Sequence, residues 1–211
     1  PDEQLADASL RSELVGALGA MGDATVAAEA RTRFARLASD PRALDGPLKT
    51  TWLGIAAQNA RVQEWELLAR LARESKSAVE RQAYFTQLGR VSDEGLARRA
   101  LDLALTGEAG TSSAAIITAV AAEHPELAFD FVLANRAKVE TLVDSSGRAN
   151  FIARLGQGSQ DQGMIGKLEA FRATLREDER RPVDQVLVSL RQRLESEPRL
   201  RSELAAWLAA K

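Results

Sequence analysis

Histidine and cysteine carry much of enzyme catalysis and transition-metal binding, and this sequence is nearly empty of both. It contains no cysteine, and its single histidine is His124. A histidine pair for zinc needs two such residues, and a Cys/His nucleophile couple needs one of each kind. Neither arrangement can be assembled from this inventory.

His124 lies in the segment Glu123-His124-Pro125-Glu126, the one place where an imidazole stands beside carboxylates. A zinc or acid–base role would need partners from elsewhere in the chain, and none with an imidazole or thiol exists. A helix start explains the segment better, because Pro125 suits the first helical position and Glu126 interacts favourably with the helix dipole. We therefore predict a helix N-terminus here.

A second segment, Gly156-Gln157-Gly158 followed by Gly163, invites comparison with a phosphate-binding loop. Its spacing matches neither a Walker loop nor a dinucleotide fingerprint, and it follows a predicted helix rather than a strand. The segment is more typical of a helix end and a turn.

A third set of residues could bind a peptide. Its members are polar or cationic and lie near helix ends or on the less apolar side of their predicted helices. On a concave surface they could receive a peptide carboxylate, since Arg offers a bidentate fork and Tyr a hydroxyl. Ordinary solvation, or pairing between helices, is the alternative for each. The peptide-contact candidates are Arg81, Tyr84, Gln87, Asn135, Arg136, Arg148 and Asn150.

The bulk composition is that of a globular protein. Of 211 residues, 45% are hydrophobic and 27% charged, and the formal net charge is −2 with both signs interspersed. Nothing here favours a nucleic acid or an anionic membrane as partner. No apolar run approaches the roughly 20 residues that would cross a bilayer. A chain without cysteine fits either the cytosol or a bacterial periplasm.

The elements that must position the candidate residues are short amphipathic helices ended by turns. Gly22 and Asp23 mark one such boundary, Ser77 with Glu80 forms a capping-box pattern, and Asp93 caps a further helix. Apolar residues recur at helical spacing between these signals, and no stretch alternates as a strand does. We also expect Pro198 to interrupt the last helix and the three tryptophans to lie on buried faces.

About a dozen helices joined by turns of a few residues should pack as antiparallel hairpins. No strict repeat period is present, which leaves an irregular α-solenoid of the HEAT or armadillo type with a concave face. No linker rich in Gly, Pro or Ser divides the chain. The sequence therefore predicts an all-α fold and a single domain over residues 1–211.

Several segments together resemble a known family. Glu80 to Phe85 with Leu88, then Asp93, Leu96 and the run Ala100-Leu101-Asp102-Leu103-Ala104-Leu105, are similar to the C-terminal helical domain of zinc aminopeptidases of the aminopeptidase N and puromycin-sensitive type. Further matching segments are 10–14, 125–132 with Asn135, 168–171 and 203–208.

The resemblance implies a detached, non-catalytic C-terminal domain of a larger enzyme. In that family the zinc site, His-Glu-x-x-His plus a distal Glu, lies in an upstream domain, so zinc would belong to the parent enzyme and no cofactor to this chain. The expected partners are the upstream catalytic domain and a peptide substrate. The domain would close over the catalytic domain, enclose the substrate cavity and limit access to short peptides. The parent would be a bacterial enzyme of the cytoplasm or periplasm.

Two other functions stay open on the sequence. One is a free-standing α-solenoid adaptor that binds a partner protein on its concave face. The other is a helical enzyme whose pocket would need convergent carboxylates with shifted pKa values, which this sequence does not single out.

Overall fold

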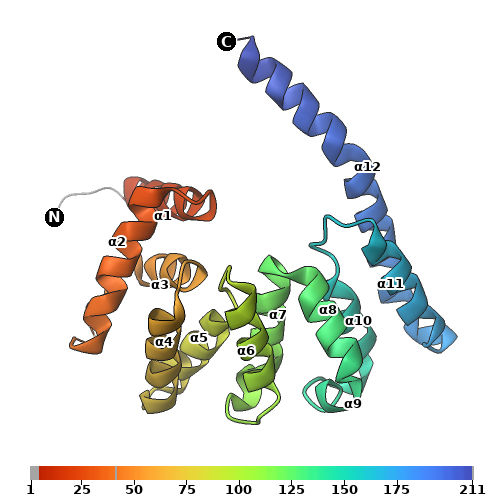
Figure 1. Ribbon diagram of the computed structural model, residues 1–211, viewed down its shortest axis with the longest axis horizontal. Coiled ribbons are helices and arrows are strands. Elements are labelled where there is room, and N and C mark those ends of the chain that lie inside the picture. Colours follow the sequence, from red (N-terminus) through yellow and green to blue (C-terminus); the bar gives the residue numbers. More distant parts are fainter. Residues whose placement is uncertain (1–4, 41, 211) are drawn as a thin grey trace. The chain divides into compact units, whose positions relative to one another are not determined.

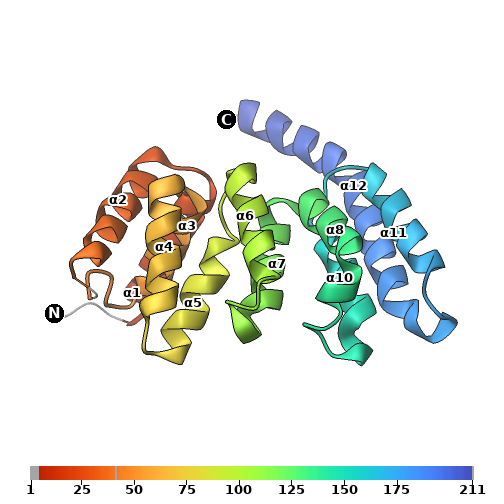
Figure 2. The same ribbon diagram turned by 60° about the horizontal axis from the view of Figure 1, so that its bottom comes forward.

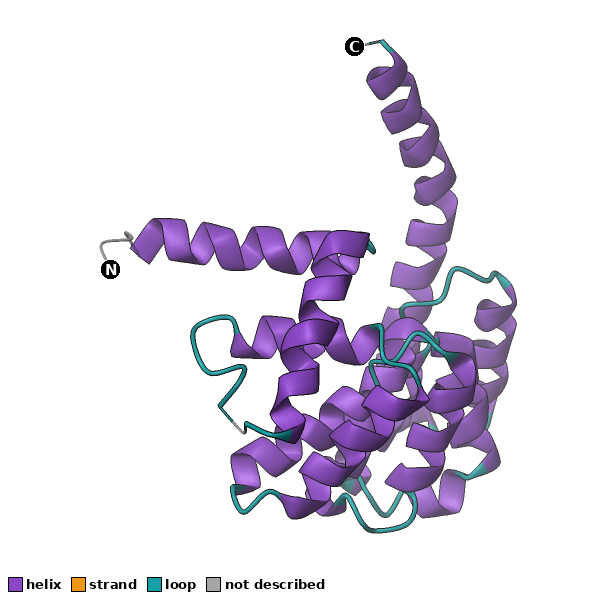
Figure 3. Ribbon diagram, turned by 60° about the vertical axis from the view of Figure 1, so that its left-hand side comes forward, coloured by secondary structure: helices purple, strands orange, loops and turns teal. Residues whose placement is uncertain are grey.

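The computed structural model describes residues 5–40 and 42–210, and within these ranges the protein is all-helical. These residues form twelve α-helices and four short 3₁₀ helices, 77% of the described residues are helical, and the described ranges contain no strand. Figure 3, coloured by secondary structure, shows helices and connecting loops alone in the parts it draws. The predicted all-α class is confirmed.

The chain forms two compact units, Pro1–Val120 and Ala121–Lys211 (Figure 1). In the first unit the short 3₁₀ helices are η1 (Arg36–Ala38) and η2 (Gly110–Ser112). Its α-helices are α1 (Leu5–Ala20), α2 (Ala24–Ala35), α3 (Lys49–Gln58), α4 (Val62–Glu74), α5 (Ala78–Leu88), α6 (Glu94–Ala104) and α7 (Ser113–Glu123) up to Val120.

The core of the first unit forms where neighbouring helices pack in pairs. α4 packs mainly against α5, and α2 against α3 (Figure 2). Phe85 and Leu88 of α5 are buried, as is Trp65 of α4. The indole Nε1 of Trp65 donates a hydrogen bond to the carbonyl of Leu88 (3.1 Å), which satisfies its polar atom inside the core.

In the second unit the longest helix is α12 (Arg181–Ala209). It packs against two shorter helices, α10 (Arg148–Leu155) and α11 (Gly163–Ala173). The contact between Phe129 and Phe171 lies in the core, with ring centroids 6.3 Å apart at an interplanar angle of 90°. The elements of this unit are α8 (Pro125–Ala134), α9 (Arg136–Val139), η3 (Ser145–Gly147), α10 (Arg148–Leu155), α11 (Gly163–Ala173), η4 (Glu177–Glu179) and α12 (Arg181–Ala209).

The predicted helix boundaries follow from local chemistry. Gly22 adopts φ 77° after α1, and the Asp23 carboxylate then accepts hydrogen bonds from the backbone N–H groups of Thr25 and Val26. Asp93 caps α6 in the same way through Leu96. Pro125 occupies the start of α8, as predicted for the segment around His124.

The capping box predicted at Ser77 and Glu80 forms only in half. Ser77 Oγ accepts from the backbone N–H of Glu80 (3.3 Å). The Glu80 carboxylate instead accepts from Lys49 Nζ of α3 (3.0 Å). The ion pair with Lys49 thus replaces the hydrogen bond that the Glu80 carboxylate would accept from the backbone N–H of Ser77 in a complete capping box.

Two expectations about the last helix were wrong. Pro198 lies inside α12, which runs unbroken from Arg181 to Ala209. Proline removes one N–H donor from a helix, and a long helix tolerates this. Trp207 is 53% exposed, whereas Trp52 and Trp65 are buried as predicted. The solenoid arrangement, the concave face and the single domain remain predictions.

Candidate functional site

Three of the seven peptide-contact candidates lie along α5 in the first unit. Arg81 is exposed in the first turn, and its Nη2 donates to the carbonyl of Ser75 (3.1 Å). Tyr84 is buried one turn further along, and Gln87 is half-buried in the last turn. The spacing of three residues brings neighbouring members together along the helix.

An ion-pair cluster adjoins Tyr84. Lys49 Nζ lies 3.0 Å from Glu80 Oε1 and 3.1 Å from Asp45 Oδ1. The hydrogen bond that Lys49 donates to the Glu80 carboxylate is the largest cause of a pKa of Lys49 above its usual 10.5. Burial, followed by the Glu80 carboxylate, raises the pKa of Tyr84 above its usual 10.0. At neutral pH Lys49 is therefore charged and Tyr84 keeps its proton.

Gln87 faces α3 at a glycine. A Cβ added at Gly54 would lie 3.8 Å from Gln87 Oε1 and 3.6 Å from Arg90 Nη1. Within the described part of the chain, the buried Oε1 of Gln87 has no hydrogen-bond partner. An amide oxygen and a guanidinium nitrogen thus both approach the bare backbone of Gly54. Gly54 inside an apolar helix was the available sequence signal for this close approach.

The four candidates of the second unit are mostly engaged with their own unit. Asn135 ends α8, and its Nδ2 donates to the carbonyl of Phe131 (2.9 Å). Arg148 Nε donates to the carbonyl of Glu140 (2.9 Å), which fastens the turn before α10. Asn150 is exposed on the first turn of α10.

Arg136 makes three contacts inside the unit. Its Nε lies 2.5 Å from Glu140 Oε1, and its Nη1 donates to Thr174 Oγ1 (3.0 Å). The guanidinium also lies over the Phe171 ring, 5.4 Å from the centroid. These contacts give Arg136 a packing role, and its possible contact with a peptide remains a prediction.

The Gly156–Gly163 segment is a turn, as predicted, and it is fastened by a side chain that the sequence did not single out. Ser159 is fully buried and its hydroxyl donates to the Glu126 carboxylate. The same hydroxyl accepts from the backbone N–H of Asp161 (3.0 Å), and Arg193 donates to the Ser159 carbonyl. The Ser159 hydroxyl and the Asp161 N–H are therefore both used in hydrogen bonds within the unit. These hydrogen bonds give the turn a structural role.

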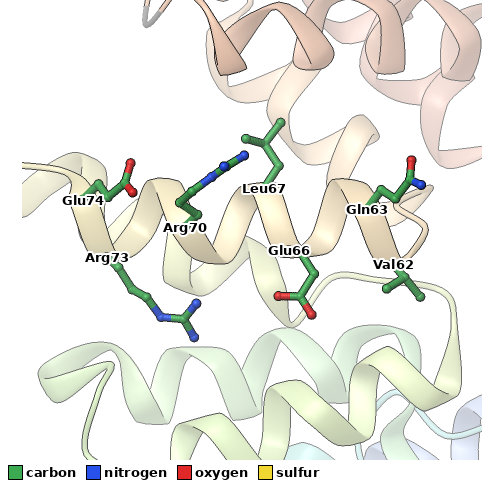
Figure 4. A pocket seen from close by; sticks show the side chains of 7 residues that line it. All are labelled: Val62, Gln63, Glu66, Leu67, Arg70, Arg73 and Glu74. Carbon is green, nitrogen blue, oxygen red and sulfur yellow. The ribbon is translucent and has the colours of Figure 1, made fainter.

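A surface hollow of about 570 Å³ lies along α4, and Figure 4 shows the side chains that line it. Glu66 and Arg73 point to one side of the helix, and Leu67 and Arg70 to the other. Glu66 pairs with Arg99 of α6. Arg73 Nε lies 2.6 Å from a carboxylate oxygen of Glu108. The hollow is lined by one helix, and two of its four charged side chains, Glu66 and Arg73, are used in ion pairs with other residues.

No group of three or more His, Cys, Asp or Glu residues is placed to hold a metal ion among residues 5–40 and 42–210. The zinc site that the resemblance implies would need ligands from another part of the parent enzyme. No helix in the same ranges is long and apolar enough to span a membrane.

Comparison with known proteins places the chain in a family. A sequence model of the ERAP1-like C-terminal domain matches residues 1–192. The match covers most of the chain, so the protein belongs to this family, the C-terminal helical domain of M1 aminopeptidases. A search of curated proteins finds no match.

Proposed function

We propose that this chain is the non-catalytic C-terminal domain of a zinc-dependent aminopeptidase that removes N-terminal residues from peptides. The family match over residues 1–192 carries the proposal. The residue inventory supports it, because a sequence with one histidine and no cysteine needs its catalytic zinc ligands elsewhere in the enzyme.

The proposed role is to enclose the substrate cavity over the upstream catalytic domain and to limit access to it. Enclosure favours hydrolysis by excluding bulk water and by holding the peptide in a productive orientation. The α5 group of Arg81, Tyr84 and Gln87, with Arg90 beside Gln87, offers cationic and amide groups suited to a peptide carboxylate and backbone.

The exposed apolar face of α1 suits contact with the upstream domain. Leu10, Leu14 and Leu18 are 54%, 54% and 42% exposed, at a spacing that places them on one side of the helix. The opposite side packs closely on α3, where a Cβ added at Gly19 would lie 2.5 Å from Ile55 Cδ1. α1 therefore has one face fixed to its unit and one apolar face left for a partner.

The test of enclosure is the dependence of hydrolysis on substrate size in the longer polypeptide that the proposal requires. We expect short peptides to be trimmed, and a folded protein that carries the same flexible N-terminal residues to be resistant. Equal kcat/KM for the two substrates would contradict a role in limiting access. An aminoacyl anilide measures the catalytic domain alone and serves as the control substrate.

A further inference from the structure

The last helix of the second unit is continuous but bent. α12 runs from Arg181 to Ala209 without a break, and Pro198 lies inside it. Figure 2 shows the C-terminal part of α12 turned at an angle to the part beside α11, and Figure 3 shows the bend from another side. Sharp bends in helices have local causes, and an internal proline is one of them.

Two side chains weaken the backbone hydrogen bonds at one place in this helix. Pro198 has no N–H to donate to the carbonyl of Leu194, and its ring crowds that carbonyl. Ser196 Oγ donates to the carbonyl of Arg193 (3.3 Å), which in an α-helix also accepts from the N–H four residues later. Hydroxyls that bond back to the helix in this way often bend it. We call residues 193–198 the joint of α12.

The burial of the helix changes at the joint. The buried residues before it are Val183, Val186, Leu187 and Leu190. Beyond it, every residue from 198 to 210 is exposed. The core of the unit therefore fixes the first part of α12 more firmly than the last part.

Two surface hollows border the joint. One has a volume of about 280 Å³ and lies between the joint and the turn residues Gln160 and Gln162. The other has a volume of about 330 Å³ and lies between the joint and Gln160. Because the joint faces open space on these sides, the helix can change its angle there without displacing close-packed core residues.

One ion pair crosses the proline. Glu197 precedes Pro198 and Arg201 follows it, and Arg201 Nε donates to Glu197 Oε1 (2.9 Å). Ion pairs at this spacing stabilise a helix only weakly, and salt screens them where they are exposed. The pair therefore restrains the joint without locking it. A second pair, Arg199 with Glu203, lies wholly beyond the proline.

We infer that α12 is hinged at the joint. Residues 199–209 turn relative to the core of the second unit, and the ion pair of Glu197 and Arg201 limits the turn. The hinge is a property of this chain alone and does not depend on the proposed function. The joint begins directly after residue 192, where the family match ends, so the match itself does not assign it.

The distance distribution between two spin labels, measured by pulsed electron paramagnetic resonance on the 211-residue chain, tests the inference. The chain has no cysteine, so Gln185→Cys and Ser202→Cys supply the sole labelling sites, both at exposed positions. A straight helix would place these positions about 25 Å apart. We expect Pro198→Ala to lengthen the mean distance and to narrow the distribution to about half its width.

Glu197→Gln should widen the distribution about 1.5-fold, because the restraint across the proline is lost. Glu203→Gln is the matched control, since it breaks the pair that lies beyond the proline, and it should leave the width unchanged. Circular dichroism checks that each variant keeps its helix content.

Two results would overturn the hinge. One is an equal width of the distribution with and without Pro198→Ala. The other is a change of mean distance with no change of width, which would describe a fixed bend. A distribution for Glu197→Gln no wider than that for Glu203→Gln would contradict the role of the ion pair as a restraint.

Discussion

The candidate residues fall into two groups in the structure. Some stabilise the fold through hydrogen bonds, and others keep exposed polar atoms that could bind a peptide. The guanidinium group of Arg136 donates a hydrogen bond to a nearby side chain, and that of Arg148 donates to a nearby backbone carbonyl. Arg81 is exposed and makes one hydrogen bond to a neighbouring turn. Substitution of Arg148 should therefore act mainly on stability, and substitution of Arg81 mainly on peptide binding.

Arg81→Ala in the longer enzyme should raise KM for longer peptides by about 3- to 10-fold and leave stability within about 0.5 kcal/mol. The physical reason is the loss of a cationic contact to the distant end of the peptide. Steady-state kinetics over a series of peptide lengths provides the measurement. An aminoacyl anilide, which is too short for the contact, should show no change, and an unchanged KM for all peptides would remove Arg81 from the site.

Arg148→Ala should lower the free energy of unfolding by about 1–3 kcal/mol, because the carbonyl of Glu140 loses a charged donor. Urea denaturation followed by circular dichroism measures the change. Asn150→Ala, at an exposed site in the same helix, is the control and should be nearly neutral. Equal stability of the two variants would contradict the structural role assigned to Arg148.

The raised pKa values of Tyr84 and Lys49 predict a loss of stability in strong alkali. A group with a raised pKa in the folded state contributes its full stability below its ordinary pKa, and loses it as pH rises through the folded pKa. The free energy of unfolding should therefore fall above about pH 10. Tyr84→Phe should show a shallower fall between pH 9 and pH 11 in urea titrations. Parallel curves for the two proteins would refute the effect of Tyr84.

At the scale of helices, much of the fold follows from local signals in the sequence. Asp23 and Asp93 mark helix starts because capping depends on a few neighbouring backbone N–H groups. The prediction that Pro198 interrupts the last helix was wrong, because a proline inside a long helix removes one hydrogen bond without ending the helix. The exposure of Trp207 could not be predicted, since helical periodicity alone does not say which apolar residues the packing of helices buries.

The candidate site was less predictable than the helices, because its contacts join residues that are distant in the sequence. The approach of Gln87 and Arg90 to Gly54 exists because α5 packs against α3, two helices separated in sequence by α4. Helical periodicity gives the face on which Gln87 lies but not the residue opposite it. Ser159 was missed because it is an ordinary serine in a turn, and only the fold brings Glu126 to it.

Helix packing also predicts how glycine substitutions differ. A Cβ added at Gly89 would lie 2.5 Å from the backbone oxygen of Ile116, whereas at Gly16 the nearest atom is Thr51 Cγ2 at 3.8 Å. Gly89→Ala should destabilise by about 1–3 kcal/mol, because α5 and α7 must move apart. Gly16→Ala should stabilise by about 0.5–1 kcal/mol through helix propensity. Thermal unfolding of both variants provides the comparison, and a neutral Gly89→Ala would contradict the packing described.

For the molecule as a whole, the family match is the main observation. The chain belongs to the C-terminal helical domain of M1 aminopeptidases. The exposed apolar face of α1 is the surface through which we expect it to meet the rest of the enzyme. Catalysis and access to substrate would then be divided between separate parts of one polypeptide.

The most direct test of this division is zinc content together with aminoacyl-anilide hydrolysis, measured on this chain and on the longer polypeptide. The account predicts a longer polypeptide that holds zinc and hydrolyses the anilide, and a chain of 211 residues that does neither. Hydrolysis by the chain alone would contradict the non-catalytic assignment. A longer polypeptide without zinc or activity would contradict the aminopeptidase assignment and favour a protein-binding adaptor.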